Sequence, residues 1–295
     1  MHEARAVGCR ALQVQDPVSQ GAISAWLLYP TGAPARAVSF GPYQVDVAMD
    51  AQPDGELLPL VAVSHGNGGS PWTHRGTALH LARAGFAVAL LEHPGNSRSD
   101  NRLAHTAQNL CDRPRHLALV LDAAFADLAL GPRLLAGVAA VLGHSIGAYT
   151  ALALAGGRPR SFPKEEPDGQ SRSLQVPRDP RVRALVLLAP AAAWFLEAGS
   201  LGGVTAQIFL RTGALDSIAP HRELVMRDLA AVITDEQIVP NAGHFSFQSP
   251  FPQSMIRPDF PPSQDPPGFD RVSYQCQLNA EVEAFLRGAL RGADR

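Results

Sequence analysis

Ser145 lies in residues 143–147, which read Gly-His-Ser-Ile-Gly, between an apolar run at 138–142 and a helix-like run at 148–154. A serine between glycines at a strand-to-helix turn is typical of a nucleophile elbow: the glycines allow a sharp turn, which presents the hydroxyl above a sheet. A phosphate-binding turn with an incidental serine is the alternative. It is disfavoured because the pattern is not G-x-G-x-x-G and no G-K-[ST] follows.

A nucleophilic serine needs a base, and in this arrangement the chain order is serine, acid, histidine. His221 and His244 are the histidines that follow Ser145. His244 comes just after the predicted strand 236–239, on a loop at its carboxyl end. His221 follows Pro220 at a predicted helix start, where solvent exposure explains it. We therefore predict His244 as the general base.

Asp216 is the predicted acid, which would hold the imidazole in the correct tautomer. It follows the predicted strand 206–210, again at a carboxyl end. Asp235 is the main competitor, but it precedes a strand and is expected at the opposite end of the sheet. For Asp216 the alternative role is helix capping ahead of residues 218–220.

Hydrolysis through an acyl intermediate also needs donors for an oxyanion. Residues 65–69, His-Gly-Asn-Gly-Gly, follow the predicted strand 60–63, where lipases and esterases carry a glycine-rich oxyanion loop. The backbone N–H groups of Asn67 and Ile146 are the predicted donors, with Gly68 a near alternative. A plain flexible loop is the competing interpretation.

Strands and helices must alternate to position these residues. We predict strands at 22–29, 60–63, 86–91, 138–142, 182–188, 206–210 and 236–239. Helices are expected from Ser70 to Gly85, at about 113–130, at 221–231 and at 280–290, and the Gly- and Pro-rich stretch before Leu57 is expected to be a surface connection. This alternation predicts an α/β fold, a mostly parallel sheet with helices on both faces.

We expect one domain over residues 1–295, with a polar insertion at about 158–179 and a Pro-rich loop at about 250–267. Phe245, Phe247 and Phe251 accompany this loop just after His244. They are predicted to line an acyl pocket, with plain packing as an equal alternative. The insertion is a weaker candidate for a cap because its charges suit solvent.

Composition argues against several classes of partner. With 46% hydrophobic residues and a net charge of −2, the chain has no field to attract nucleic acid or an anionic membrane. Its three scattered cysteines and ten histidines show no metal-ligand spacing, so no metal is expected. The first residues lack a signal-peptide core and no apolar stretch reaches spanning length, so we expect a cytoplasmic, soluble protein.

The sequence resembles the bacterial "predicted dienelactone hydrolase" group of the α/β-hydrolase superfamily, which is similar to platelet-activating-factor acetylhydrolases. The resemblance covers nearly the whole chain. It implies an α/β-hydrolase fold and ester hydrolysis by Ser145, Asp216 and His244 without a cofactor. The segments that carry it are 29–31, 41–43, 64–69, 92–97, 143–147 and 243–245.

The chain departs from this family in two places. Dienelactone hydrolases use a cysteine where Ser145 stands, so the resemblance does not imply a dienelactone substrate, and Glu92 stands where relatives commonly have aspartate. The expected substrate is a small-molecule carboxylic ester. A thioesterase, lactonase or amidase with the same residues remains open, as do a non-enzymatic binding module and the oligomeric state.

Overall fold

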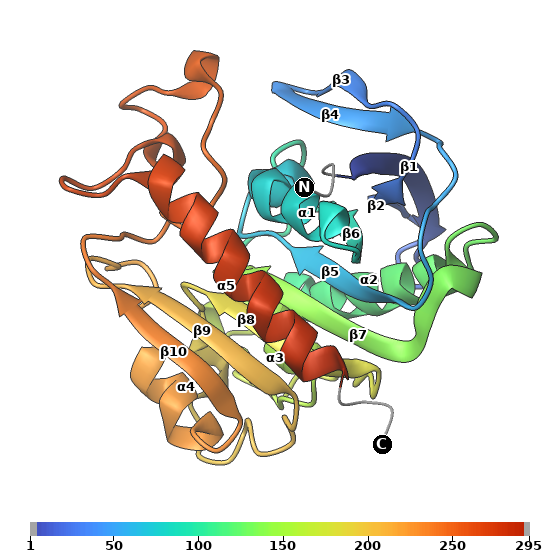
Figure 1. Ribbon diagram of the computed structural model, residues 1–295. Helices are drawn as coiled ribbons and strands as arrows, with labels where there is room; N and C mark the ends of the chain where they lie inside the picture. The colour runs from blue at the N-terminus through green and yellow to red at the C-terminus, as the bar shows by residue number, and fades with distance from the viewer. Residues whose placement is uncertain (1–4, 292–295) are drawn as a thin grey trace.

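A ten-stranded sheet runs through the computed structural model, which describes residues 5–291 (Figure 1). The spatial order of the strands is β10-β9-β8-β7-β5-β6-β2-β1-β4-β3. Their bounds are β1 Ala6–Gln15, β2 Ala22–Thr31, β3 Arg36–Phe40, β4 Tyr43–Met49, β5 Leu58–Ser64, β6 Ala87–Leu91, β7 Leu134–His144, β8 Val182–Leu188, β9 Gln207–Gly213 and β10 Ile233–Val239.

From β6 to β10 every neighbouring pair of strands is parallel, whereas β2 joins β6 in the antiparallel sense. Alternate residues of β5 point to opposite faces: Leu60 and Ala62 enter one core cluster, and Val61 and Val63 enter the other. Both faces are therefore buried, which explains why these strands read as continuous apolar runs rather than alternating ones.

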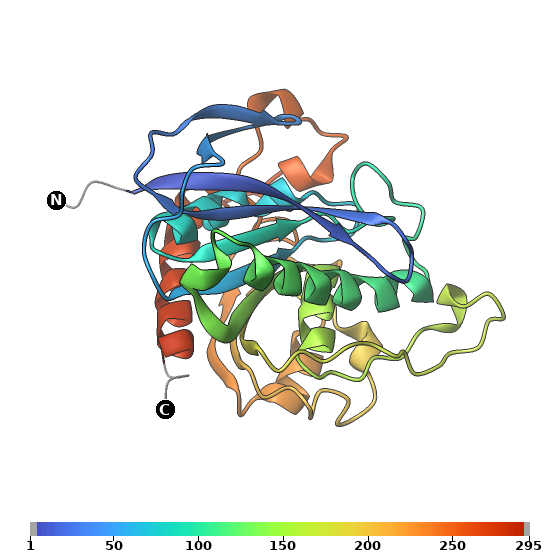
Figure 2. The ribbon, with the colours of Figure 1, turned by 90° about the vertical axis from the view of Figure 1, so that its right-hand side faces the viewer.

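Helices cover both faces of the sheet, as predicted (Figures 1 and 2). Helices α2, α3 and α4 supply one apolar cluster, and α1 and α5 supply the other. The mostly parallel α/β architecture expected from the sequence is confirmed. The helix bounds are α1 Arg75–Arg83, α2 Ala107–Ala126, α3 Ile146–Leu154, α4 Arg222–Leu229 and α5 Arg271–Arg291.

Helix α2 begins at Ala107, not near Arg113 as expected. Thr106 caps it by accepting a hydrogen bond from the Asn109 N–H at 3.1 Å, and the helix continues through Pro114. A proline inside a helix leaves the carbonyl four residues earlier without its usual donor. Here the Tyr149 hydroxyl donates to the carbonyl of Leu110 at 2.9 Å, so this helix tolerates its proline.

Strands β1, β3 and β4 were not predicted from the sequence. Strands β3 and β4 form a hairpin in the stretch expected to be a surface connection, with Phe40 paired to Tyr43 across the turn. Along β4, residues Tyr43, Val45 and Val47 are buried while the residues between them are exposed. This period-two alternation is a strand signal, which the neighbouring glycines and prolines obscured.

Helix α5 starts nine residues before the expected Ala280, at Arg271. Asp270 explains the start, since its Oδ1 accepts hydrogen bonds from the N–H groups of Val272 and Ser273. The Pro-rich loop ahead of it is irregular except for two short 3₁₀ helices. The 3₁₀ helices of the chain are Pro71–His74, Gly131–Arg133, Pro163–Glu165, Ala193–Phe195, Gln253–Met255 and Pro261–Ser263.

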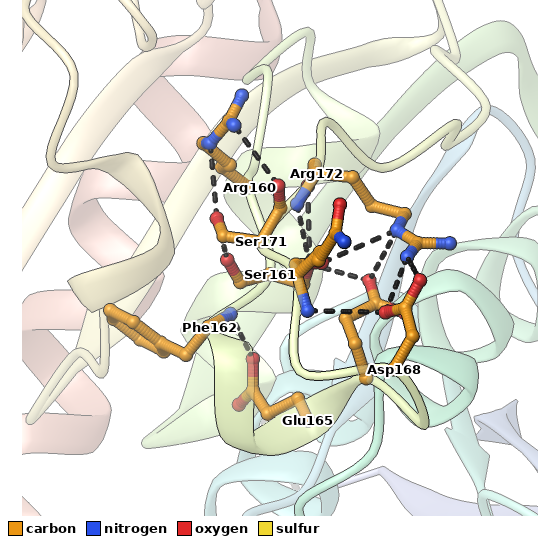
Figure 3. Close-up of polar contacts among 9 residues, drawn as sticks. Arg160, Ser161, Phe162, Glu165, Asp168, Ser171 and Arg172 are labelled. Atoms are coloured by element: carbon orange, nitrogen blue, oxygen red, sulfur yellow. Dashed lines mark hydrogen bonds and ion pairs between the residues drawn. The ribbon is translucent and has the colours of Figure 1, made fainter.

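The insertion at 158–179 extends away from the body of the molecule and is held largely by polar contacts (Figures 2 and 3). Within it, Arg172 pairs with Asp168 at 2.6 Å, and the Phe162 N–H donates to Glu165 at 2.8 Å. Glu165 also accepts a hydrogen bond from the indole N–H of Trp194 at 3.0 Å. This contact anchors the insertion to the segment that follows β8.

Among residues 5–291, no helix combines the length and apolarity needed to cross a bilayer. The expectation that the chain lacks an export signal rests partly on residues 1–4, which lie outside the described residues.

Candidate active site

Ser145 occupies a sharp turn between β7 and α3, with φ 57° and ψ −122°. Positive φ is costly for a residue with a side chain, so the surroundings must impose it. The flanking glycines allow the turn to pack closely. A Cβ on Gly143 would lie 2.3 Å from the Gly147 carbonyl oxygen, and one on Gly147 would lie 1.9 Å from that of Ser64.

Ser145, His244 and Asp216 form one hydrogen-bonded chain. The Ser145 Oγ lies 2.9 Å from Nε2 of His244, and Nδ1 of His244 lies 2.9 Å from Oδ2 of Asp216. The side chains of His244 and Asp216 are each only 4% exposed. Their burial limits competition from water for the hydrogen bond between them, which strengthens it.

The Asp216 carboxylate also serves the cap that was the alternative role. Its Oδ1 accepts the N–H groups of Ile218 at 2.9 Å and Ala219 at 3.0 Å. Burial raises the pKa of Asp216, but the hydrogen bonds from His244 and these two N–H groups outweigh it and hold the pKa below its ordinary value. A single carboxylate therefore does both jobs and stays ionised.

The competing residues make other contacts. Asp235 lies within β10 and pairs with Arg211 at 2.8 Å. His221 directly precedes α4, where its Nδ1 accepts the N–H of Ala192 at 3.4 Å. Of the two histidines that follow Ser145, only His244 is hydrogen-bonded to it within the described residues.

His144 precedes the serine at a variable position of the G-x-S-x-G motif, so no role for it was expected from the sequence. Its Nε2 donates to the carbonyl of His244 at 2.8 Å, and its ring centroid lies 5.1 Å from that of His244. Because a carbonyl only accepts, His144 carries its proton on Nε2. The residue before the serine thus ties the loop that carries His244 to the elbow.

The two predicted oxyanion donors belong to segments that lie next to Ser145. Ile146 is the first residue of α3, so its N–H has no partner within the helix. The loop with Asn67 passes close by, since a Cβ on Gly66 would lie 3.4 Å from the Ser145 Cβ. Within residues 5–291 neither of these N–H groups donates to another protein group, so both are free for a ligand.

A cavity of about 570 Å³ opens beside Ser145 and His244. Phe245 and Phe251 line it. Phe247 does not: its side chain is 1% exposed and packs edge-on against Tyr274 in the core, on the α5 side of the sheet. Other lining residues include Pro42, Tyr43, Arg98, Gln248, Met255, Arg257, Phe260 and Pro262.

No group of three or more His, Cys, Asp or Glu side chains in the described part of the chain is arranged to hold a metal ion. The three cysteines are free thiols, and burial raises the pKa of Cys9 to about 12. Cys9 is therefore an inert core thiol.

Neither a family model nor a curated protein matches the sequence. Solved structures do resemble the chain, and they identify its fold. A ferulic acid esterase from Streptomyces cinnamoneus superimposes with a TM-score of 0.71 at 20% identity, covering 99% of this chain and 92% of that one. The chain has an α/β-hydrolase fold. A dienelactone hydrolase from Anabaena variabilis ATCC 29413 superimposes with a TM-score of 0.53 at 18% identity, covering 95% and 97%.

The α/β-hydrolase fold explains how the site is assembled. Asn67 follows β5, Ser145 follows β7, Asp216 follows β9 and His244 follows β10. These strands are parallel, so their carboxyl ends share one edge of the sheet, where ligand sites of such sheets form. Residues up to 177 positions apart in sequence thereby reach a single site.

Proposed function

We propose that this chain is a serine hydrolase that cleaves a small-molecule carboxylic ester through an acyl-enzyme on Ser145. The hydrogen-bonded chain from Ser145 through His244 to Asp216 carries the proposal, because both of its links measure 2.9 Å and it opens on a cavity. The two free backbone N–H groups beside the serine support it.

In the first half-reaction, the Ser145 Oγ attacks the ester carbonyl carbon while His244 Nε2 takes the hydroxyl proton. The carbonyl oxygen becomes an oxyanion and accepts hydrogen bonds from the N–H groups of Asn67 and Ile146. Asp216 stabilises the imidazolium. Collapse of the intermediate breaks the bond to the alcohol oxygen, which receives the proton from His244 and departs as the alcohol.

In the second half-reaction, a water gives a proton to His244 and attacks the acyl carbon on Ser145. The second oxyanion collapses, Ser145 recovers its proton from His244, and the carboxylic acid leaves. The reaction as written consumes one water and needs no metal or cofactor.

The lining of the cavity is mixed: Phe245, Phe251 and Phe260 present aromatic surface, and Arg98, Arg257 and Gln248 add polar and charged groups to those of the triad and the oxyanion loop. The aromatic part of the lining suits an apolar acyl group. The two structural neighbours named above are an esterase and a hydrolase by name, which supports hydrolysis of an ester-type bond here.

Rates across a matched panel test the proposal. Nitrophenyl esters of increasing acyl length, lactones, thioesters and amides should be compared for the wild type and Ser145→Ala. We expect the nitrophenyl esters to be cleaved fastest and Ser145→Ala to be inactive on all of them. Faster cleavage of a thioester, lactone or amide with equal dependence on Ser145 would keep the mechanism and change the substrate class.

Labelling separates an enzyme from a binding module that has kept the fold. A fluorophosphonate should label the folded wild type at Ser145, as shown by peptide mass mapping, and should leave Ser145→Ala unlabelled. Folded wild type that neither labels nor hydrolyses any member of the panel would overturn the proposal.

A further inference from the structure

Arg113, on α2, is the largest of the fully buried side chains and is 0% exposed. Burying a charge is costly unless it is paired, and the other buried arginines are paired. Arg211 contacts Asp235 and Glu281, and Arg271 contacts Asp265. Within residues 5–291 no carboxylate pairs with Arg113.

Neutral oxygens satisfy its guanidinium instead. Nη1 donates to the Asn96 Oδ1 at 2.6 Å, and Nε donates to the Thr150 Oγ1 at 3.0 Å. Nη2 donates to the Ser64 Oγ at 3.2 Å and to the carbonyl of His65. Every one of these acceptors belongs to a residue that is itself fully buried.

These contacts reach both oxyanion donors. On one side, Asn96 Nδ2 donates to the side-chain oxygen of Asn67 at 2.7 Å. On the other side, the Thr150 hydroxyl donates to the carbonyl of Ile146 at 3.0 Å. Asn67 belongs to the loop after β5 and Ile146 to the start of α3, so the guanidinium links the two segments that flank Ser145.

Among the residues that the structure describes, none neutralises the charge of Arg113. Burial, followed by the charge of Arg113, lowers the pKa of His65 to about 3 and that of His93 well below its ordinary value, so both imidazoles are neutral. Burial lowers the pKa of Arg113 itself to about 9, which leaves it protonated at neutral pH. A fixed positive charge therefore lies behind the oxyanion loop.

We propose that Arg113 is a positioning residue that holds the two halves of the oxyanion hole together and biases them electrostatically toward negative charge. The inference rests on the proposed function. The charge that would compensate Arg113 forms only when the ester carbonyl becomes an oxyanion, so the contribution belongs to the transition state.

The test compares Arg113→Gln, Arg113→Lys and the control Arg211→Gln, which alters a buried but ion-paired arginine outside the site. For each, kcat and KM on an ester cleaved through Ser145 are measured. Thermal unfolding is also measured, as is inhibition by a trifluoromethyl ketone, which forms an alkoxide on the serine. The oxyanion hole stabilises this alkoxide, so the affinity for the ketone falls when the oxyanion hole is disturbed. A smaller fraction of folded enzyme does not change this affinity.

We expect Arg113→Gln to lower kcat by about 10²-fold, to weaken the ketone by a similar factor and to change KM by less than about 3-fold. Arg113→Lys keeps the positive charge but lacks the planar guanidinium with its several donors. Its kcat and ketone affinity should therefore lie between those of Arg113→Gln and wild type. Arg211→Gln should lower the melting temperature and keep kcat.

Folded Arg113→Gln with wild-type kcat and ketone affinity would overturn the inference. So would a loss of kcat without a matching loss of ketone affinity, because that pattern assigns Arg113 to folding. If Arg113→Gln does not fold, Asn96→Ala and Thr150→Val can be tested instead. Each removes the hydrogen bonds between Arg113 and one of the two segments while keeping Arg113 itself. Each should reduce kcat and ketone affinity by roughly 3- to 10-fold. Full activity in both would also overturn it.

This outcome is distinguishable from failure of the proposed function. Absence of any Ser145-dependent ester cleavage in the wild type overturns the proposed function, and this inference with it. If the wild type cleaves esters and the Arg113 variants keep wild-type kcat and ketone affinity, only the role of Arg113 is overturned.

Discussion

Oδ2 of Asp216 lies 2.9 Å from Nδ1 of His244, while Oδ1 of the same carboxylate caps the turn at residues 218–219. The cap fixes the carboxylate, and the carboxylate fixes the imidazole. The orientation of His244 therefore depends on the backbone that follows β9 as well as on its own loop.

Asp216→Asn should keep the cap, because an amide oxygen can accept the same two N–H groups, but it should favour the wrong tautomer of His244. We expect kcat to fall by roughly 10²- to 10⁴-fold with a smaller change in KM. Steady-state kinetics measures both. Asp235→Asn is the matched control: it removes a carboxylate that pairs with Arg211, and it should leave kcat near the wild-type value.

Ser145→Ala and His244→Ala should each lower kcat by roughly 10³-fold or more, and the double variant should lose little beyond either single one, because the two groups act as a unit. Circular dichroism and thermal unfolding should show folded protein. Additive losses in the double variant, or near-normal turnover in either folded single variant, would contradict the mechanism.

Phe251→Ala and Phe247→Ala form a contrasting pair. Phe251 lines the cavity, so its loss should shift the preferred acyl length toward longer chains more than it changes the rate on the shortest ester. Phe247 is a core residue, so Phe247→Ala should cost about 3–5 kcal/mol of unfolding free energy and leave the length preference unchanged. Urea denaturation and rates on a series of nitrophenyl esters measure the two effects. A changed length preference in Phe247→Ala, together with an unchanged preference in Phe251→Ala, would show that Phe247 rather than Phe251 lines the cavity.

Glu165→Ala should loosen the insertion without altering catalysis, because no residue of 158–179 lines the cavity. The lost hydrogen bonds to Trp194 and to the Phe162 N–H should cost about 1–3 kcal/mol in urea denaturation. Lys164→Ala, an exposed neighbour, should stay within about 0.5 kcal/mol of wild type. A changed kcat or acyl preference in Glu165→Ala would assign the insertion a part in covering the site.

Stability should fall as the pH drops from about 6.5 to about 4. Burial lowers the pKa of His74 to about 4 from an ordinary value of 6.5, and burial together with Arg113 lowers that of His65 to about 3. In this window the unfolded chain binds protons at these positions and the folded chain does not, so acid favours unfolding.

Each such histidine contributes a slope of roughly 1.4 kcal/mol per pH unit. The slope disappears above the ordinary value, where neither state is protonated. Urea denaturation at pH 7, 6 and 5 measures it. His74→Phe should show a shallower slope, and an unchanged slope would mean that His74 titrates alike in the folded and unfolded chains.

The strands of the parallel sheet were readable from sequence because burial on both faces makes them short apolar runs: β8 was predicted with its observed bounds, Val182–Leu188. The site residues were nameable because they lie just after such runs. The order of serine, acid and histidine along the chain then left few candidates for the acid and the base that act with Ser145.

Features that depend on a distant partner were not predictable in this way. Helix α2 continues through Pro114 because Tyr149, from another helix, satisfies the Leu110 carbonyl. The inward turn of Phe247 depends on Tyr274 of α5. Arg113 looked like any helical arginine, since nothing in its neighbourhood along the chain shows that α2 buries it against the loop after β5.

The walls of the cavity come from opposite ends of the sequence: the β3–β4 hairpin supplies Pro42 and Tyr43, and the Pro-rich loop 250–267 supplies Phe251 and Phe260. Both segments lie toward the top of Figure 1. Neither contains a member of the hydrogen-bonded chain at Ser145. A library randomised at these two segments would therefore explore substrate scope while preserving the proton-transfer machinery, which makes this scaffold suited to directed evolution of new specificities.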